Sequence, residues 1–369
     1  MAGIYLHIPF CKHKCTYCDF TSFAGRSEYA EAYMACLIKE IEMWGEKLKE
    51  KTFDTVYFGG GTPSFIDPNY IYGAMNQVTK CFHLTKDPEV TIEMNPGTVS
   101  EKKIETYLRA GIDRFSIGLQ TAIDEQLSEI GRIHNVRDYL YCTSLLKGRN
   151  FSADVMLGLK GQTKEDIRKT IELVAASGAK HVSMYALTPE DGTPIYTDYL
   201  NGELPDGDEV REMYDFGVTL LKKHGYLRYE VSNFAKPGFE SRHNLNYWKR
   251  GEYIGMGVSA SSFLNGHRFT NTFDLDEYMK CILSGFFPIL TDEEVKGEEA
   301  KFEFVMLALR TARGISSKEY KDAFGSDWKD DFSEAYRKTK QYFAEEGDIT
   351  RIKDEYLYVQ NQILADYIR

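Results

Sequence analysis

Three cysteines lie close together near the start of the chain. Cys11, Cys15 and Cys18 are spaced C-x3-C-x2-C. Thiolates are soft ligands that suit iron–sulfur clusters and zinc. Structural zinc usually takes four protein ligands, often from two C-x2-C pairs, and the sequence holds no second pair. We therefore predict a [4Fe–4S] cluster held by three cysteines, which leaves one iron open. The alternatives are a zinc site and a chance group of core cysteines.

The other four cysteines are scattered singly along the chain. They are Cys36, Cys81, Cys142 and Cys281. A disulfide framework would show an even count and a regular spread. We expect these four to be small core residues in a reducing compartment.

Short apolar strands alternate with helical stretches up to about residue 190. The predicted strands are Ile4–Ile8, Thr55–Phe58, Val90–Glu93, Arg114–Gly118, Ala153–Leu157 and His181–Leu187. Regular alternation implies parallel strands joined by right-handed crossovers. Six such units predict an α/β fold, an open, three-quarter β/α barrel. In barrels the chemistry gathers at the carboxyl ends of the strands, where Cys11, the run Gly59–Gly61, Glu93 and Gln120 all lie.

The rest of the chain is less regular. Between 196 and 290 we expect a helix over Asp208–His224, a strand near Tyr229–Val231 and a loop over Arg242–Gly257. From 291 to 369 the pattern is mostly helical and ends in a hairpin over Gly347–Tyr358 and a last helix, which is typical of a winged-helix-like domain. The predicted domains are therefore 1–195, 196–290 and 291–369.

Composition narrows the class of protein. The 369 residues carry a net charge of −11, which disfavours nucleic acid as a partner. Hydrophobic residues make up 43%, enough for a large core, and no apolar run approaches the roughly 20 residues that span a bilayer. The first residues read as a strand and not as a signal peptide, so we expect a cytoplasmic protein.

The segment Tyr5-Leu6-His7-Ile8-Pro9-Phe10-Cys11, together with the cysteine spacing, resembles the radical S-adenosylmethionine (SAM) superfamily, and within it the coproporphyrinogen dehydrogenase (HemN) class. The resemblance extends over most of the chain. It implies that the open iron chelates the amino and carboxylate groups of SAM, and that an electron from the cluster then cleaves SAM to a 5′-deoxyadenosyl radical. It also implies that Tyr5 touches the sulfonium and that Tyr17, inside the cysteine motif, lies near the cofactor. The alternative for Tyr5 is an ordinary barrel aromatic.

Further residues of the predicted SAM pocket follow the next strands. Gly60, Gly61 and Thr62 belong to a glycine run whose backbone can approach a ligand closely. By resemblance, Glu93 contacts the ribose or the amino acid part of SAM, because a carboxylate accepts hydrogen bonds from either. The polar residues that match the pocket of the class are Gln120, Arg132 and Asp154. For each, the alternative is a capping or salt-bridge role.

Two features separate the oxidases of this class from their relatives. The oxidases carry a fourth cysteine two residues after the third, where this chain has Phe20, and they begin with an extra segment that we expect to be missing here. The run Arg242–Trp248 contains H-N-x2-Y-W, which resembles the haem-binding signature of the HemW haem chaperones. His243 could then be an axial ligand, with Tyr247 and Trp248 offering flat apolar surface to a porphyrin. The alternative is a histidine that caps a turn beside two core aromatics.

These resemblances predict a radical SAM protein that acts as a haem chaperone. It would bind a [4Fe–4S] cluster, SAM and haem, and pass haem to client haemoproteins, with respiratory enzymes at the membrane as candidate clients. A homodimer is left open. The rival functions are an oxygen-independent coproporphyrinogen III oxidase and another radical SAM enzyme acting on haem, such as a methyltransferase that opens the ring. We expect the remaining histidines, among them His7, His134 and His181, to be structural.

Overall fold

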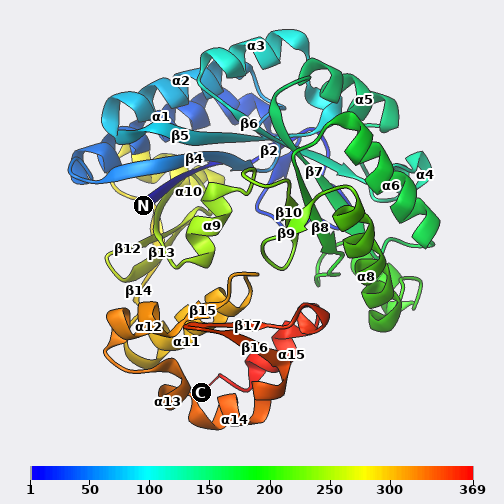
Figure 1. Ribbon diagram of the computed structural model, residues 1–369. Helices are drawn as coiled ribbons and strands as arrows, with labels where there is room; N and C mark the ends of the chain where they lie inside the picture. Colours follow the sequence, from blue (N-terminus) through cyan, green and yellow to red (C-terminus); the bar gives the residue numbers. More distant parts are fainter. Residues whose placement is uncertain (1, 369) are drawn as a thin grey trace.

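The computed structural model describes residues 2–368, and parallel strands form the centre of its large sheet (Figure 1). These strands are β1 (Ala2–Ile8), β4 (Thr52–Gly60), β5 (His83–Met94), β6 (Arg114–Gln120), β7 (Asn150–Leu157) and β8 (His181–Ala186). Each is hydrogen-bonded in parallel to the next in this order. The predicted six-unit partial barrel is confirmed.

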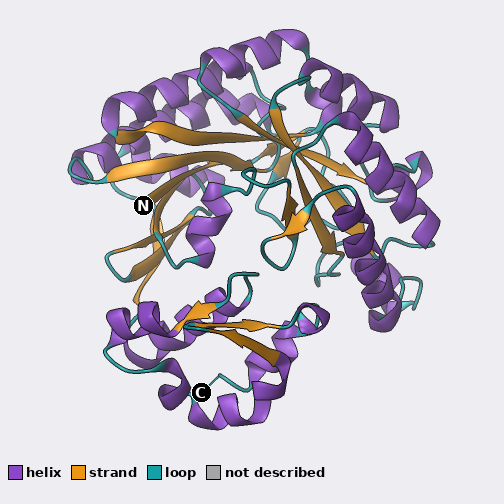
Figure 2. Cartoon of the chain, viewed as in Figure 1, coloured by secondary structure: helices purple, strands orange, loops and turns teal. Residues whose placement is uncertain are grey.

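Helices cover the outer face of this sheet (Figure 2). In chain order the helices of this part of the chain are α1 (Ala30–Lys47), α2 (Pro68–Cys81), α3 (Glu101–Arg109), α4 (Asp124–Glu129), α5 (Val136–Leu145), α6 (Lys164–Ser177), α7 (Ile195–Leu200) and α8 (Gly207–Lys223). Their ends are set by local chemistry. Thr163 and Asp166 form a capping box at the start of α6, and Gly178 ends it in the left-handed conformation.

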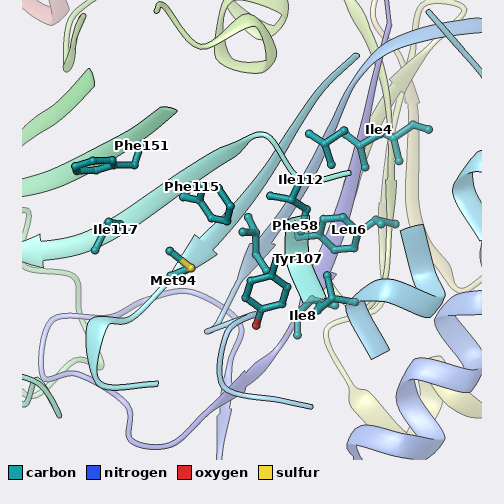
Figure 3. Packing of buried hydrophobic residues seen from close by; sticks show 14 of the residues in the cluster. Ile4, Leu6, Ile8, Phe58, Met94, Tyr107, Ile112, Phe115, Ile117 and Phe151 are labelled. Atoms are coloured by element: carbon teal, nitrogen blue, oxygen red, sulfur yellow. The ribbon is translucent and has the colours of Figure 1, made fainter. Parts of the chain in front are cut away.

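The alternation of side chains along each strand separates an apolar outer face from a polar interior. On β1, Ile4, Leu6 and Ile8 are fully buried under the helices, and Figure 3 shows them in one cluster with Phe58 and Phe115. The alternate residues point into the barrel, where Tyr5 is in register with Tyr57. The period-2 pattern therefore packs the core on one face and frees the other for a site.

The sheet continues beyond these six strands at both edges. On the β1 side it adds β11 (Glu252–Met256), β12 (Ser261–Leu264), β13 (His267–Asn271) and β14 (Ile289–Glu294), and on the β8 side β10 (Asn233–Ala235) and β9 (Leu227–Arg228). The strand predicted near Tyr229–Val231 is wrong in place, because this segment turns between β9 and β10. Helix α10 (Leu275–Leu283) packs against α1.

The loop predicted over Arg242–Gly257 is also wrong. It consists of helix α9 (Arg242–Trp248) and strand β11, which pairs in parallel with β1. The glycines there favoured a loop at the sequence level. One of them, Gly255, serves close backbone packing instead, because a Cβ would lie 2.1 Å from the carbonyl oxygen of Ser261.

The C-terminal part has a small sheet and a hydrophobic cluster of its own. Its elements are α11 (Gly297–Leu309), β15 (Ile315–Ser316), α12 (Ser317–Phe324), α13 (Trp328–Asp331), α14 (Ser333–Thr339), β16 (Phe343–Glu346), β17 (Ile349–Ile352) and α15 (Gln360–Ala365). Trp328 and Tyr367 are fully buried in this second cluster. The predicted helices and hairpin are present, but the hairpin turns at Gly347 instead of beginning there. The domain boundary at 290/291 stays a prediction.

The structure also bears on the scattered cysteines and on membrane-spanning helices. Cys36 and Cys142 are buried as predicted, whereas Cys81 and Cys281 are only half-buried. Within residues 2–368 no helix is both long and apolar enough to cross a membrane.

Candidate functional site

The cysteine motif forms the connection after β1. Cys11 is buried on the short strand β2 (Phe10–Cys11), which pairs with β3 (Phe23–Ala24), and the loop between them carries Cys15 and Cys18. Within the loop the Cys18 N–H donates a hydrogen bond of 3.2 Å to the Cys15 carbonyl. The first thiol is therefore fixed by sheet pairing, and the other two by a tight turn at the carboxyl end of β1.

The protein environment disfavours the charged form of two of the three thiols. Burial raises the pKa of the Cys11 and Cys18 thiols, and the neighbouring cysteines of the motif raise it further. Thiols of this kind lose their proton and become thiolates when a bound metal cation compensates the negative charge of the sulfur. Between residues 2 and 368 no three His, Cys, Asp or Glu side chains converge on a single ion. In a cubane each cysteine binds a different iron, so three thiols on one loop can hold it without meeting at a single ion.

The glycine run at the end of β4 lets the backbone pass close to the motif. A Cβ on Gly61 would lie 3.0 Å from Cys11 Sγ and 2.9 Å from the backbone of Pro9. Gly60 has φ of +114°, and a Cβ there would lie 2.6 Å from the His7 ring. Thr62 Oγ1 is 3.4 Å from Cys11 Sγ. Only glycine satisfies the packing and the backbone conformation at Gly60.

Glu93, near the end of β5, is held inside the barrel by two donors. The Tyr57 O–H donates to Oε1 at 2.8 Å, and the Gly60 N–H donates to Oε2 at 3.1 Å. Burial raises the pKa of Glu93 to about 7, and Asp154 adds to this rise. A carboxyl with such a pKa can change its protonation state when a cationic ligand binds.

Tyr5 is oriented by His7. His7 Nε2 lies 2.9 Å from the Thr21 carbonyl, so this nitrogen carries the hydrogen, and Nδ1 accepts from the Tyr5 O–H at 3.0 Å. Burial lowers the pKa of His7 to about 4, which keeps the ring neutral. From the sequence we expected His7 to be structural. His7 lies two residues after Tyr5 on the same strand, so both side chains point into the barrel, and this spacing could have predicted a role for His7 next to the site.

Arg132 links the cysteine loop to the far side of the barrel. Its Nη1 lies 3.6 Å from Cys15 Sγ and 3.4 Å from the Tyr17 hydroxyl, while Nη2 donates to the Gly118 carbonyl at 2.6 Å. The buried Nε has no hydrogen-bond partner among the described residues. Arg132 therefore contacts the Cys15 thiol and keeps one N–H, that of Nε, without a hydrogen-bond partner among the described residues.

Gln120 and Asp154 lie on the next strands of the barrel. Gln120 has φ of +74° at an irregularity of β6, and its Oε1 accepts from the Tyr185 O–H at 3.0 Å. Burial raises the pKa of Asp154 to about 6, which Arg114 and Arg132 partly oppose. Both residues face the interior, on the side of Arg132.

A cavity of about 580 Å³ brings part of the predicted set together. Tyr5, Gly60, Glu93 and Tyr247 line it, so residues from β1, β4, β5 and α9 meet there. The other charged residues of its wall are Asp19, Arg250, Arg268 and Glu303. Tyr57 and the two arginines were missed at the sequence level. Tyr57 had a signal, its position two residues before the glycine run on the inward face, whereas the arginines had none. We call this space the cluster-side cavity.

The three residues of the H-N-x2-Y-W motif do not share one surface. His243 is buried, with Nδ1 2.7 Å from Thr55 Oγ1 and Nε2 2.8 Å from the Tyr247 hydroxyl. Its ring stacks on Tyr57 at 5.0 Å. Both ring nitrogens are thus engaged within the protein, and neither is free for iron in this arrangement. Tyr247 lines the cluster-side cavity, while Trp248 lines a different one.

Comparison with known protein families matches two parts of the chain. Residues 5–174 match the radical SAM superfamily, and residues 295–352 match the HemN C-terminal domain. These ranges contain the cluster motif with the barrel strands β4–β7, and the helices α11–α14 with the hairpin β16–β17.

Several relatives with similar sequences are haem chaperones. The chain is 34% identical to the haem chaperone HemW of Bacillus subtilis, over 88% of this chain and 87% of the relative. It is 32% identical to HemW of Haemophilus influenzae, over 99% and 97%. Among solved structures, the coproporphyrinogen III oxidase HemN of Escherichia coli aligns with a TM-score of 0.88 at 18% identity, over 99% of this chain and 89% of that one. This last likeness concerns the fold.

Proposed function

Because the chain belongs to the radical SAM superfamily and, within it, to the HemW haem chaperone family, we propose that it binds haem and passes it to client haemoproteins. The observation that carries the proposal is the similarity to haem chaperones over nearly the whole chain, C-terminal part included. Its cofactors are a [4Fe–4S] cluster and SAM, with haem as the cargo.

The chain's own residues divide the work on the cluster and SAM. Cys11, Cys15 and Cys18 would hold the cluster, whose open iron supplies a chelation site for SAM. Glu93 presents a carboxylate already aligned by Tyr57 and Gly60, suited to a hydroxyl or ammonium group. Tyr5 lines the same cavity, and its hydroxyl is fixed by the hydrogen bond to His7. Arg132 places its guanidinium group beside Cys15, with Nη1 3.6 Å from Sγ.

A coproporphyrinogen oxidase is the rival function, because the chain shares the HemN fold. Against it stands Phe20, which occupies the position of the oxidases' fourth cysteine and is 69% exposed at the wall of the cluster-side cavity. A phenyl ring cannot replace the thiol that the oxidases carry at this position.

One preparation tests the two functions. The full chain is reconstituted anaerobically with iron and sulfide, titrated with haem, and then incubated with SAM, a reductant and coproporphyrinogen. We expect haem binding and no decarboxylated product. Steady formation of protoporphyrinogen would overturn the chaperone function in favour of the oxidase, and a ring-opened, methylated haem would favour the third function.

The finer assignments extend this proposal. Respiratory enzymes at the membrane are the proposed clients, and transfer of haem to such an apo-enzyme in vesicles, followed by its absorbance, tests them. The cytoplasm is the proposed compartment, because thiolates that hold a cluster need a reducing environment. Whether the chain works as a homodimer is decided by sedimentation of the reconstituted protein with and without haem.

A further inference from the structure

Helix α9 stands between two cavities. It contacts β1 and β4 on one side and α11 of the C-terminal part on another (Figure 1). Tyr247 faces the cluster-side cavity, and the adjacent Trp248 faces a second space of about 760 Å³. Leu227 and Tyr229 from the barrel edge and Phe304 from α11 also line this second space, which we call the interdomain cavity.

The two cavities differ in charge. The charged wall residues of the cluster-side cavity are Asp19, Glu93, Glu303, Arg250 and Arg268, three acids against two bases. Those of the interdomain cavity are Arg228, Lys249, Arg250, Arg313, Glu240 and Glu319, four bases against two acids. In a chain with net charge −11 this basic excess is local. A SAM cation suits the first wall, and the two propionates of haem suit the second.

The interdomain cavity also has the shape and apolar surface for a porphyrin. Its volume lies within the range of roughly 300–1,000 Å³ of small-molecule sites. Trp248 and Phe304 provide aromatic faces, and Leu245 and Ala308 add aliphatic surface. A flat apolar ring with two acidic edges matches such a wall.

Two of the basic side chains of the interdomain cavity, Arg250 and Arg313, can form a further hydrogen bond or ion pair with a ligand. Arg250 donates from Nε to Glu303 at 2.7 Å, but its buried Nη2 has no partner among the described residues. Arg313 pairs with Glu319 at 2.5 Å, with both side chains about half exposed. An exposed pair contributes little stability, so a propionate can replace Glu319 at low cost.

We propose that haem binds in the interdomain cavity, with its ring against Trp248 and Phe304 and its propionates at Arg250 and Arg313, on the opposite side of α9 from SAM. This inference rests on the proposed function and adds the place of the cargo. In it, Trp248 contacts haem directly, whereas His243 is a positioning residue that fixes α9 against β4 through Thr55 and Tyr57.

Crossed affinity measurements on the reconstituted full chain test the location. Trp248→Ala and Arg313→Gln should each weaken haem binding by about tenfold, the loss of one aromatic face or one charge-assisted hydrogen bond, and leave SAM affinity unchanged. Glu93→Gln should weaken SAM and leave haem unchanged. Arg168→Gln, which removes a half-exposed arginine of α6 that lines neither cavity, is the matched control and should change neither affinity.

The propionate contacts can be tested by changing the ligand and not the protein, so that misfolding of a variant cannot produce the expected result. Haem dimethyl ester lacks the carboxylate charges, so it should bind the wild type more weakly than haem does, and Arg313→Gln should weaken haem but not the ester. If the wild type binds haem and both cavity variants bind it equally well, the interdomain location is wrong and the chaperone function stands. If the wild type binds no haem, the proposed function itself fails.

Discussion

Among the three motif cysteines, Cys15 is the one that the far side of the barrel contacts, through Arg132 Nη1 at 3.6 Å. We expect Cys15→Ala to abolish cluster binding, because two thiolates cannot hold a cubane against exchange. Iron and sulfide content and the visible charge-transfer absorbance measure it.

Cys36→Ala is the control for that change, since Cys36 is a buried core residue of α1 and the substitution removes only one sulfur atom. Retention of the cluster by Cys15→Ala, with normal iron and sulfide, would refute the ligand assignment.

The protonation of Glu93 predicts how SAM binding depends on pH. Burial raises the pKa of Glu93 to about 7, so below this pH the carboxyl is mostly protonated and must release a proton to face a cation. We expect SAM affinity to rise about tenfold from pH 6 to pH 8 and then to level off. Calorimetry in buffers of different ionisation enthalpy measures both affinity and proton release.

Glu93→Gln is the matched variant, because it keeps the shape and removes the titration. It should bind SAM weakly at every pH, with a flat profile. A steep profile in this variant would assign the titration to another group.

At the scale of elements, the turn after β4 depends on Gly60. From the sequence we expected a side chain there to intrude on the ligand. In the structure a Cβ points at the His7 ring, 2.6 Å away, and the backbone lies at φ of +114°. We therefore expect Gly60→Val to displace His7 and to break its hydrogen bond to Tyr5. Because Tyr5 lines the cluster-side cavity, SAM affinity should then be lost.

The measurement is SAM calorimetry on the reconstituted Gly60→Val protein, with iron content as the check on the cluster. Gly111→Ala is a comparison glycine, since it also has positive φ but open space around its Cβ position. SAM affinity equal to wild type in Gly60→Val would remove the glycine run from the site.

Helix α9 is held to the barrel by His243. His243→Ala leaves Thr55 and the Tyr247 hydroxyl without this partner and opens space beneath Tyr57. We expect a loss of about 2–4 kcal/mol in the free energy of unfolding. Urea denaturation measures it, with exposed His83→Ala as the control.

The same variant separates two roles of His243. If it acts by positioning, the absorbance maxima of bound haem should stay in place while affinity falls. A shift of the maxima with unchanged stability would make His243 the axial ligand instead.

At the scale of the whole molecule, Glu303 of α11 ties the C-terminal part to the barrel. It is 12% exposed and accepts from Arg250 at 2.7 Å and from Arg268, and both guanidinium groups lie over the Phe263 ring. Glu303→Gln leaves two partly buried arginines without a counter-charge, so we expect a loss of about 2–3 kcal/mol of stability.

Thermal unfolding followed by circular dichroism measures this loss. Glu299→Gln, an exposed residue on the same helix, should unfold like the wild type. Equal melting temperatures for both variants would show that the ion pairs do not hold the two parts together.

Local sequence patterns were enough to predict the barrel strands and the cluster motif. Strands such as Ile4–Ile8 carry a period-2 pattern, and C-x3-C-x2-C is local in sequence, so both follow from near neighbours. The secondary structure of Arg242–Gly257, in contrast, depends on tertiary contacts. The pairing of β11 with β1 spans about 250 residues, and no local pattern encodes such a partner. For the same reason the sequence pattern suggested that His243, Tyr247 and Trp248 form one porphyrin surface. The packing of α9 instead buries His243 and places Tyr247 and Trp248 in two different cavities.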